Sequence, residues 1–155
     1  MMAHKDVLFR SAAREAILRG ATRLADTIRV TPGPRSKSVL IDRKYGPPLV
    51  CNDGVTIAKE FDLKDATENL GVRMLRQAAE RTADAVGDGT STATVLPQAI
   101  FADGVRNVVA GASAIDIKRG LDRGALVAIA ALKDLSRPVK TRREKSQVPP
   151  LQCTR

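Results

Sequence analysis

The chain has 155 residues, with 26 Lys and Arg against 17 Asp and Glu, which gives a net charge of +9 at pH 7. This length is ample for one domain and short for two. An apolar fraction of 43% excludes a disordered or collagen-like chain. No apolar run approaches the roughly 18 residues of a membrane span, and the first ten residues lack the apolar stretch of a secretory signal, which predicts a cytoplasmic protein. Alanine dominates the apolar residues and aromatic residues make up only 3%, so a helix-rich body is favoured over a β-sandwich.

The excess positive charge is concentrated near the C-terminal end of the sequence. Residues 1–135 contain 20 basic and 16 acidic residues, whereas residues 136–155 contain six basic residues and one acidic residue. Such a stretch attracts nucleic acid or an anionic membrane surface. However, Arg137–Lys145 has no aromatic residue for base stacking and no amphipathic period. We interpret it as a solvated basic stretch, and a small nucleic-acid-binding protein is the weakest alternative.

The first elements in chain order are a helix and a β-hairpin. Apolar residues recur on one helical face over residues 11–29, which predicts a helix. The prolines of Thr31–Pro34 end it because proline donates no backbone hydrogen bond. The apolar runs Val39–Ile41 and Leu49–Cys51 flank a segment rich in glycine and proline, which is typical of a hairpin.

Two capping patterns then predict a short helix and a long one. Asp53 stands where the N-cap of a helix over residues 55–61 would be. The spacing of Asp65 and Glu68 is that of a capping box, and it opens a longer helix that ends at Gly87.

Periodicity predicts two more long helices, over residues 90–109 and 114–135. Pro97 lies inside the first of them and conflicts with it. The apolar residues of that helix share one side: Val95, Leu96, Ala99 and Ile100. From Ser136 onward the helical pattern fails.

The segment with the most chemical information is Gly87-Asp88-Gly89-Thr90-Ser91-Thr92, a carboxylate between glycines followed by hydroxyl residues at a helix start. A helix N-terminus offers unpaired N–H groups and a positive dipole end, which stabilise phosphate oxygens. Asp88 is a suitable ligand for Mg²⁺, which prefers oxygen. The same residues also suit an ordinary turn with a threonine N-cap, so the segment by itself leaves both readings open. It is neither a Walker A loop nor a dinucleotide fingerprint.

Several collinear segments together resemble the N-terminal part of the GroEL-type, group I chaperonins, from about residue 3 to residue 148. The segments that carry the resemblance are Lys5-Asp6-Val7, Ile17-Leu18-Arg19-Gly20, Asp53-Gly54-Val55-Thr56-Ile57, Glu68-Asn69-Leu70-Gly71, the run from Gly87 to Leu96, and Asp116-Ile117-Lys118-Arg119-Gly120.

The resemblance implies a mainly α fold, the multihelical N-terminal half of a chaperonin equatorial domain with a small β-hairpin. It implies a partial equatorial, ATP-binding domain over residues 1–136 and the start of a hinge domain over residues 137–148. We expect residues 149–155 to be an out-of-frame tail, left by a one-base frameshift. The family is an ATP-hydrolysing folding chaperone of the isomerase class that forms double heptameric rings, works with a co-chaperonin and binds unfolded clients.

The resemblance also implies ATP and Mg²⁺ as cofactors and assigns the site. Asp88 would ligate Mg²⁺, and Asp53 would act in catalysis by helping to order the attacking water. The residues implied to bind the nucleotide are Thr31, Pro32, Gly33, Pro34, Asn52, Asp88, Gly89, Thr90, Ser91 and Thr92.

Departures from the family pattern lower the expected activity. Pro32 replaces a leucine, Asn52 replaces a lysine and Pro97 replaces a small residue. The hinge-domain catalytic aspartate and the apical client-binding groove are absent from this sequence. We therefore expect a truncated chaperonin subunit with impaired ATP hydrolysis, and the alternative is a non-catalytic fragment that associates with intact chaperonin rings.

Overall fold

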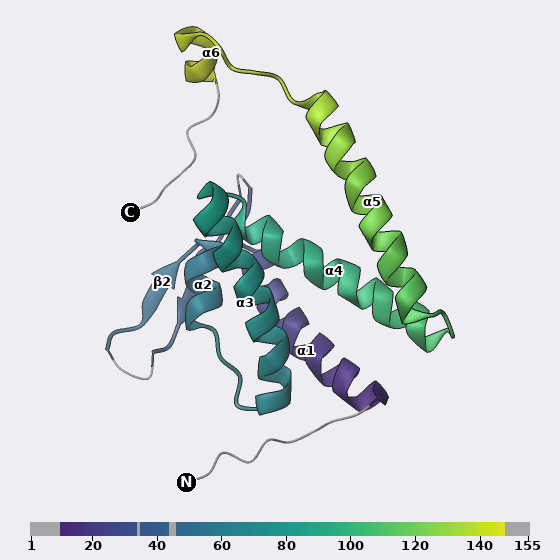
Figure 1. The fold of residues 1–155 in the computed structure, drawn as a ribbon. Helices are drawn as coiled ribbons and strands as arrows, with labels where there is room; N and C mark the ends of the chain where they lie inside the picture. Colours follow the sequence, from purple (N-terminus) through teal and green to yellow (C-terminus); the bar gives the residue numbers. More distant parts are fainter. Residues whose placement is uncertain (1–9, 34, 44–45, 148–155) are drawn as a thin grey trace. The chain divides into compact units, whose positions relative to one another are not determined.

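The computed structural model describes residues 10–33, 35–43 and 46–147. The chain divides into two compact units, Met1–Gly111 and Ala112–Arg155. The elements of the first unit are α1 (Arg10–Arg29), β1 (Val39–Ile41), β2 (Leu49–Cys51), α2 (Gly54–Glu60), α3 (Ala66–Val86) and α4 (Thr90–Val109), and those of the second are α5 (Ala114–Leu135) and α6 (Arg142–Gln147) (Figure 1). The predicted mainly α fold with a small hairpin is confirmed. The domain boundary expected at residue 136 stays a prediction.

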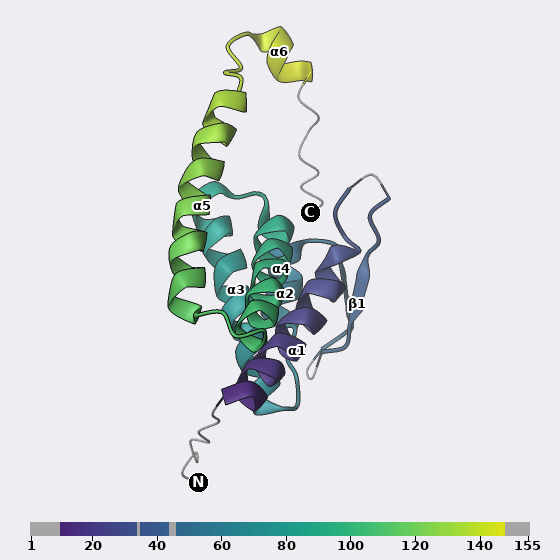
Figure 2. The ribbon, with the colours of Figure 1, turned by 90° about the vertical axis from the view of Figure 1, so that its right-hand side faces the viewer.

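The β-hairpin forms at the predicted positions. β1 and β2 pair antiparallel, with Leu40 opposite Val50 at the centre of the register. These two side chains are exposed, whereas Val39, Ile41 and Cys51 pack against the core. The alternation follows from the two-residue period of a strand, and it places the hairpin beside the helices of the first unit (Figure 2).

The core of the first unit lies where α1, α2 and α3 meet. Its fully buried residues include Leu24 and Ile28 from α1, Ile57 from α2 and Val72 from α3. The apolar stripe predicted for α1 therefore faces the core, as the periodicity indicated.

Two glycines let α1 and α3 pack at backbone distance. A Cβ atom built on Gly20 would overlap the carbonyl oxygen of Glu68, and one built on Gly71 would overlap the carbonyl oxygen of Ile17. Neither obstacle is a flexible side chain that can move away. The crossing of the two helices therefore depends on the absence of side chains at these positions.

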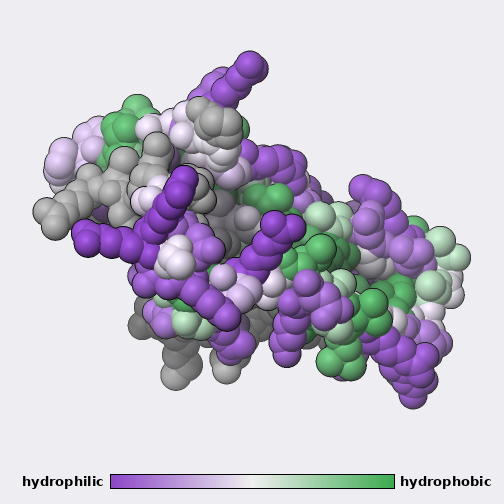
Figure 3. Space-filling view, turned by 90° about the horizontal axis from the view of Figure 1, so that it is seen from above, coloured by the Kyte–Doolittle hydropathy of each residue, from purple (hydrophilic) through white to green (hydrophobic). Residues whose placement is uncertain are grey.

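The buried side of α4 is polar. Thr94 is fully buried and donates a hydrogen bond to the Thr90 carbonyl at 2.9 Å. Gln98 is 7% exposed, and its amide donates to Thr22 Oγ1 at 3.1 Å. Because these polar groups are hydrogen-bonded, their burial costs little. Leu96 and Ile100, on the apolar side, are 56% and 41% exposed. Figure 3 shows that hydrophobic residues lie among hydrophilic ones on one face of the molecule.

The capping box expected at the start of α3 is only half formed. Asp65 accepts hydrogen bonds from the backbone N–H groups of Thr67 and Glu68, at 2.8 and 2.9 Å, which confirms the N-cap. Glu68 does not complete the box; its carboxylate pairs with Arg19 at 2.9 Å and Arg23 at 3.0 Å, both on α1. A carboxylate this buried needs a cation, and α1 supplies two.

The cap at Asp65 makes a pH-dependent contribution to stability. Hydrogen bonds from the Glu68 and Thr67 N–H groups hold the pKa of Asp65 below its ordinary value of 3.8. A folded-state pKa below the unfolded value stabilises the fold above the unfolded pKa, and the effect is lost as the pH falls through the folded pKa. We expect Asp65→Ala to lower the thermal unfolding midpoint at pH 7, with a smaller difference at pH 3. Circular dichroism melts measure both differences, and equal differences at the two pH values would contradict the account.

Two helices begin one residue earlier than predicted, and one short helix was not predicted. α1 begins at Arg10 and α2 at Gly54, each one residue before the predicted start. α6 is a helix that the sequence pattern did not predict. In the part of the chain that the structure describes, no helix is both long and apolar enough to cross a membrane.

Candidate functional site

The start of α4 differs from the starts of its neighbours. The side chains of Asp53, Asp65 and Ser113 cap α2, α3 and α5. Among the described residues, no side chain caps α4, whose N-cap is Gly89 in the left-handed conformation. A threonine N-cap is therefore wrong, because Thr90 is already the first helical residue.

The uncapped start leaves backbone donors at the end of a helix dipole. The N–H group of Ala93 donates to the Gly89 carbonyl at 2.9 Å, the first intrahelical bond. The N–H groups of Thr90, Ser91 and Thr92 precede it and have no carbonyl one turn back within the helix. Such groups are ordinary ligands for an anion.

The turn before α4 requires glycine on both sides of Asp88. Gly87 ends α3 with φ of 76°, and Gly89 also has φ of 76°. Side chains rarely adopt this conformation, so the two glycines hold the turn in place. The carboxylate of Asp88 stands between them and is exposed.

The loop after α1 reaches the start of α4. Thr31 is buried, and its hydroxyl donates to the Ile28 carbonyl at 2.8 Å. The same hydroxyl lies 3.5 Å from the hydroxyl of Ser91. Pro32 and Gly33 follow and are exposed, Gly33 with φ of 90°. Pro34 lies outside the described residues.

The start of α2 also packs against the start of α4. Gly54 is buried against Ser91, and a Cβ atom there would lie 2.7 Å from the Ser91 hydroxyl and 2.9 Å from its nitrogen. The preceding residue, Asp53, accepts hydrogen bonds from the N–H and hydroxyl groups of Thr56 at 3.0 and 2.6 Å, which confirms it as the N-cap. Both bonds use Oδ2 of the carboxylate. Three segments far apart in sequence thus meet at Ser91.

A groove of about 300 Å³ opens beside this meeting point. At one end lie Ser91 and Thr92, with Pro32 alongside. The wall is apolar and consists of Val95, Leu96 and Ala99, and Arg29 also lines the groove. We call this the α4 groove. It contains three of the sequence-predicted site residues, and it adds Arg29, which sequence reasoning missed.

The remaining predicted residues are not among those that line the α4 groove. Gly33 and Thr31 belong to the loop beside it, Asn52 and Asp53 precede α2, and Asp88, Gly89 and Thr90 lead into α4. Their assignment to one site stays a prediction.

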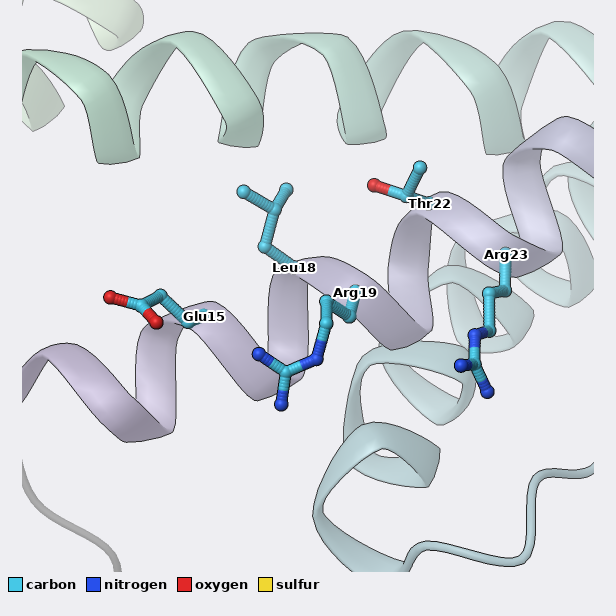
Figure 4. A pocket seen from close by; sticks show the side chains of 5 residues that line it. All are labelled: Glu15, Leu18, Arg19, Thr22 and Arg23. Atoms are coloured by element: carbon cyan, nitrogen blue, oxygen red, sulfur yellow. The ribbon is translucent and has the colours of Figure 1, made fainter.

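A larger hollow of about 420 Å³ lies along α1 (Figure 4). Its lining residues, Glu15, Leu18, Arg19, Thr22 and Arg23, all come from that helix, and none is a predicted site residue. Figure 4 shows Leu18 and Thr22 pointing to one side of α1, with Arg19 and Arg23 on the other. Since both arginines already pair with Glu68, the larger hollow has the weaker claim to a ligand.

The donor set fits a magnesium ion that arrives with a nucleotide. Within the described ranges, no group of three or more His, Cys, Asp or Glu side chains is placed to hold a metal. Mg²⁺ usually binds through one or two carboxylates, with substrate phosphates and water completing its shell. Asp88 is a carboxylate of that kind just before the uncapped start of α4, and Asp53 is a second carboxylate, at the N-cap of α2.

Most of this chain matches known proteins in sequence. The chain is a member of the TCP-1/cpn60 chaperonin family, whose model matches residues 24–151. It is similar to Chaperonin GroEL 5 of Bradyrhizobium diazoefficiens, at 72% identity over 147 residues, which cover 95% of this chain and 27% of that protein. It also resembles the crystal structure of a group III chaperonin in the open state, with a TM-score of 0.74 and 26% identity over 84% of this chain and 26% of that one. The chain therefore spans about a quarter of the length of these relatives.

Proposed function

We propose that this chain binds Mg²⁺-ATP at the start of α4, as the N-terminal part of a subunit of an ATP-dependent folding chaperone. The observation that carries the proposal is the uncapped N-terminus of α4 at the point where Thr31 and Gly54 converge on Ser91. Free amides at a helix start, flanked by hydroxyl groups, suit the phosphates of a nucleotide. Membership of the chaperonin family supports the same ligand.

The proposed roles follow from the chemistry of each group. The N–H groups of Thr90, Ser91 and Thr92 would bind phosphate oxygens, and the adjacent glycines admit them closely. When bound, Mg²⁺ would neutralise phosphate charge, and Asp88 is the residue that would hold it. Thr56 fixes Oδ2 of Asp53, so Oδ1 is the oxygen that we assign to orienting the attacking water.

The loop residues have supporting roles in this proposal. Thr31, Pro32 and Gly33 would pass along the nucleotide, with Asn52 beside the phosphates. Proline at position 32 donates no N–H group, and asparagine at position 52 brings no positive charge. We therefore propose nucleotide binding with slow hydrolysis for this chain.

Calorimetric titration with Mg²⁺-ADP tests the proposed site. We expect Asp88→Asn to weaken binding by about tenfold or more, since the substitution removes the negative charge that would face the metal. Asp84→Asn is the matched control because Asp84 is an exposed carboxylate on the last turn of α3, outside the proposed site. Unchanged affinity in Asp88→Asn, or an equal loss in both variants, would refute the assignment of Asp88.

A second candidate function is association with other chaperonin subunits. Large apolar side chains of the first unit are exposed, among them Leu40, Val50 and Met74 at 64–69%. In the second unit, residues 125–132 of α5 are apolar on every side, a pattern typical of a helix that is buried in its final assembly. Co-elution of the chain with intact chaperonin rings, without nucleotide turnover, would favour this role over ATP hydrolysis. The co-chaperonin, unfolded clients and a cytoplasmic location belong to the same proposal for the whole subunit.

A further inference from the structure

The second unit contains a long apolar helix without a single buried residue. α5 spans 22 residues, all of which the structure describes, and none of them is buried. Residues three or four apart form one face of this helix, which we call the α5 stripe: Leu121, Gly124, Val127, Ala128, Ala131 and Leu132. The large side chains of the stripe are 46–70% exposed. A contiguous apolar face of this kind marks a surface that binds a partner, since apolar surface is unfavourable in water.

The charged side chains of α5 are paired only in its first half. Four of them form two ion pairs within the helix, at 2.7 and 3.2 Å: Lys118–Asp122 and Arg119–Asp116. Arg123 and Asp134 form no ion pair and no side-chain hydrogen bond with any residue that the structure describes. Two opposite charges beside the stripe are therefore available to a partner.

Arg123 and Asp134 lie on the same edge of the α5 stripe. They are 11 residues apart, just over three helical turns, so both project from one side of the helix. When a two-fold axis relates two identical antiparallel helices, the same edge of each helix faces its equivalent. Placing Arg123 of one copy opposite Asp134 of another therefore creates the reciprocal pair as well. The charges of α5 are complementary to a second α5.

The same register centres the most apolar part of the helix. The point midway between Arg123 and Asp134 falls between Ala128 and Ile129, and this is also the midpoint of the apolar run 125–132. Gly124 and Ala128 lie on the stripe near that point, and no described atom outside the helix lies within 4 Å of a Cβ built on Gly124. Small residues let two helices approach closely. The charges and the apolar residues thus indicate one register.

We infer that α5 binds a second copy of this chain, as an antiparallel helix pair with two reciprocal Arg123–Asp134 contacts. The proposed pair is independent of the nucleotide site, and it gives the second candidate function a specific partner for this surface. A single pair of helices buries less than the roughly 1,600 Å² of a standard interface. The dimer is therefore weak, with a dissociation constant that we expect to lie in the micromolar range.

Sedimentation equilibrium of the full chain across the micromolar range tests the dimer. We expect the parent to reach twice the mass of the chain as its concentration rises. Arg123→Asp replaces both reciprocal contacts with like-charge contacts, so it should weaken the dimer by about tenfold. Adding Asp134→Arg to Arg123→Asp exchanges the two charges, and the double variant should recover most of the lost affinity.

The matched control is Lys133→Asp, which changes the net charge by the same amount on the far side of the helix. Lys133 follows Gly124 by nine residues, or two and a half turns, so it points away from the stripe. This variant should dimerise as the parent does. The inference is wrong if the parent stays monomeric, if Arg123→Asp and Lys133→Asp weaken the dimer equally, or if the double variant recovers nothing. A monomeric parent that still binds Mg²⁺-ADP, or that still co-elutes with chaperonin rings, would refute the inference and leave the proposed function intact.

Discussion

Replacing Gly71 with alanine is expected to destabilise the first unit by about 3 kcal/mol or more. The added Cβ would overlap the Ile17 carbonyl oxygen and lie 2.8 Å from the Ala21 nitrogen. Both are backbone atoms of α1, so relief requires the two helices to move apart. That movement would loosen the core around Leu24 and Val72. Since a domain is typically stable by about 5–15 kcal/mol, the loss would be a large share of the total.

Urea unfolding followed by circular dichroism measures the effect, and Gly104→Ala is its control. Gly104 lies inside α4, and no described atom outside the helix lies within 4 Å of a Cβ built there. Alanine is the better helix former, so this variant should gain about 0.5–1 kcal/mol. If both variants changed stability in the same direction and by the same amount, glycine packing between α1 and α3 would not be what holds them together.

Replacing Pro97 with alanine is expected to stabilise the chain by about 3 kcal/mol. α4 runs unbroken from Thr90 to Val109 through this residue. A proline there cannot donate to the Ala93 carbonyl, and its ring crowds that carbonyl. Alanine restores the hydrogen bond and removes the clash, while Thr94 and Gln98 keep their buried contacts.

The gain should appear as a higher urea midpoint with an unchanged slope. Pro47→Ala is the control, because Pro47 lies in the hairpin loop and outside any helix. There, proline restricts the unfolded chain, so alanine should cost about 0.4–1 kcal/mol. Surface substitutions with little effect usually change the free energy of unfolding by less than about 0.5 kcal/mol. If Pro97→Ala differs from the parent by no more than that amount, the helix already accommodates the proline.

Local signals explain why the element boundaries were predictable. The hairpin follows from alternating apolar residues around a breaker-rich loop, and its strands lie where expected. Asp65 and Gly87 mark the ends of α3 because a cap and a left-handed glycine are encoded by single residues. α6 was missed because it has no apolar period, although Thr141 and Glu144 form a capping box: Glu144 accepts from the Thr141 N–H at 2.9 Å, and Thr141 accepts from the Glu144 N–H at 3.2 Å.

The buried polar side chains and their partners could not be predicted from the sequence of any single helix. Gln98 and Thr94 are buried because partners on other turns and other helices satisfy their polar groups. Glu68 leaves its capping box because α1 brings two arginines close to it. These partners are distant in sequence. Arg19 lies 49 residues from Glu68, and Thr22 lies 76 residues from Gln98.

The candidate site, too, could be predicted from the sequence only in part. A helix start with glycines and hydroxyl groups was readable in the sequence, but its convergence with Thr31 and Gly54 was not, because the three segments are joined only by tertiary packing. The family resemblance connected them in advance. Arg29 was missed because its only local feature is a charge at the end of α1, a common position for arginine.

Amide chemical shifts during titration with Mg²⁺-ADP test the central claim most directly, that three distant segments form one nucleotide site. In ¹⁵N-correlation spectra we expect the largest shifts at Thr31, Gly54 and Ser91, all saturating at the same ligand concentration. Shifts confined to α5 and α6, or saturation at different concentrations for the three residues, would contradict a single site at the start of α4.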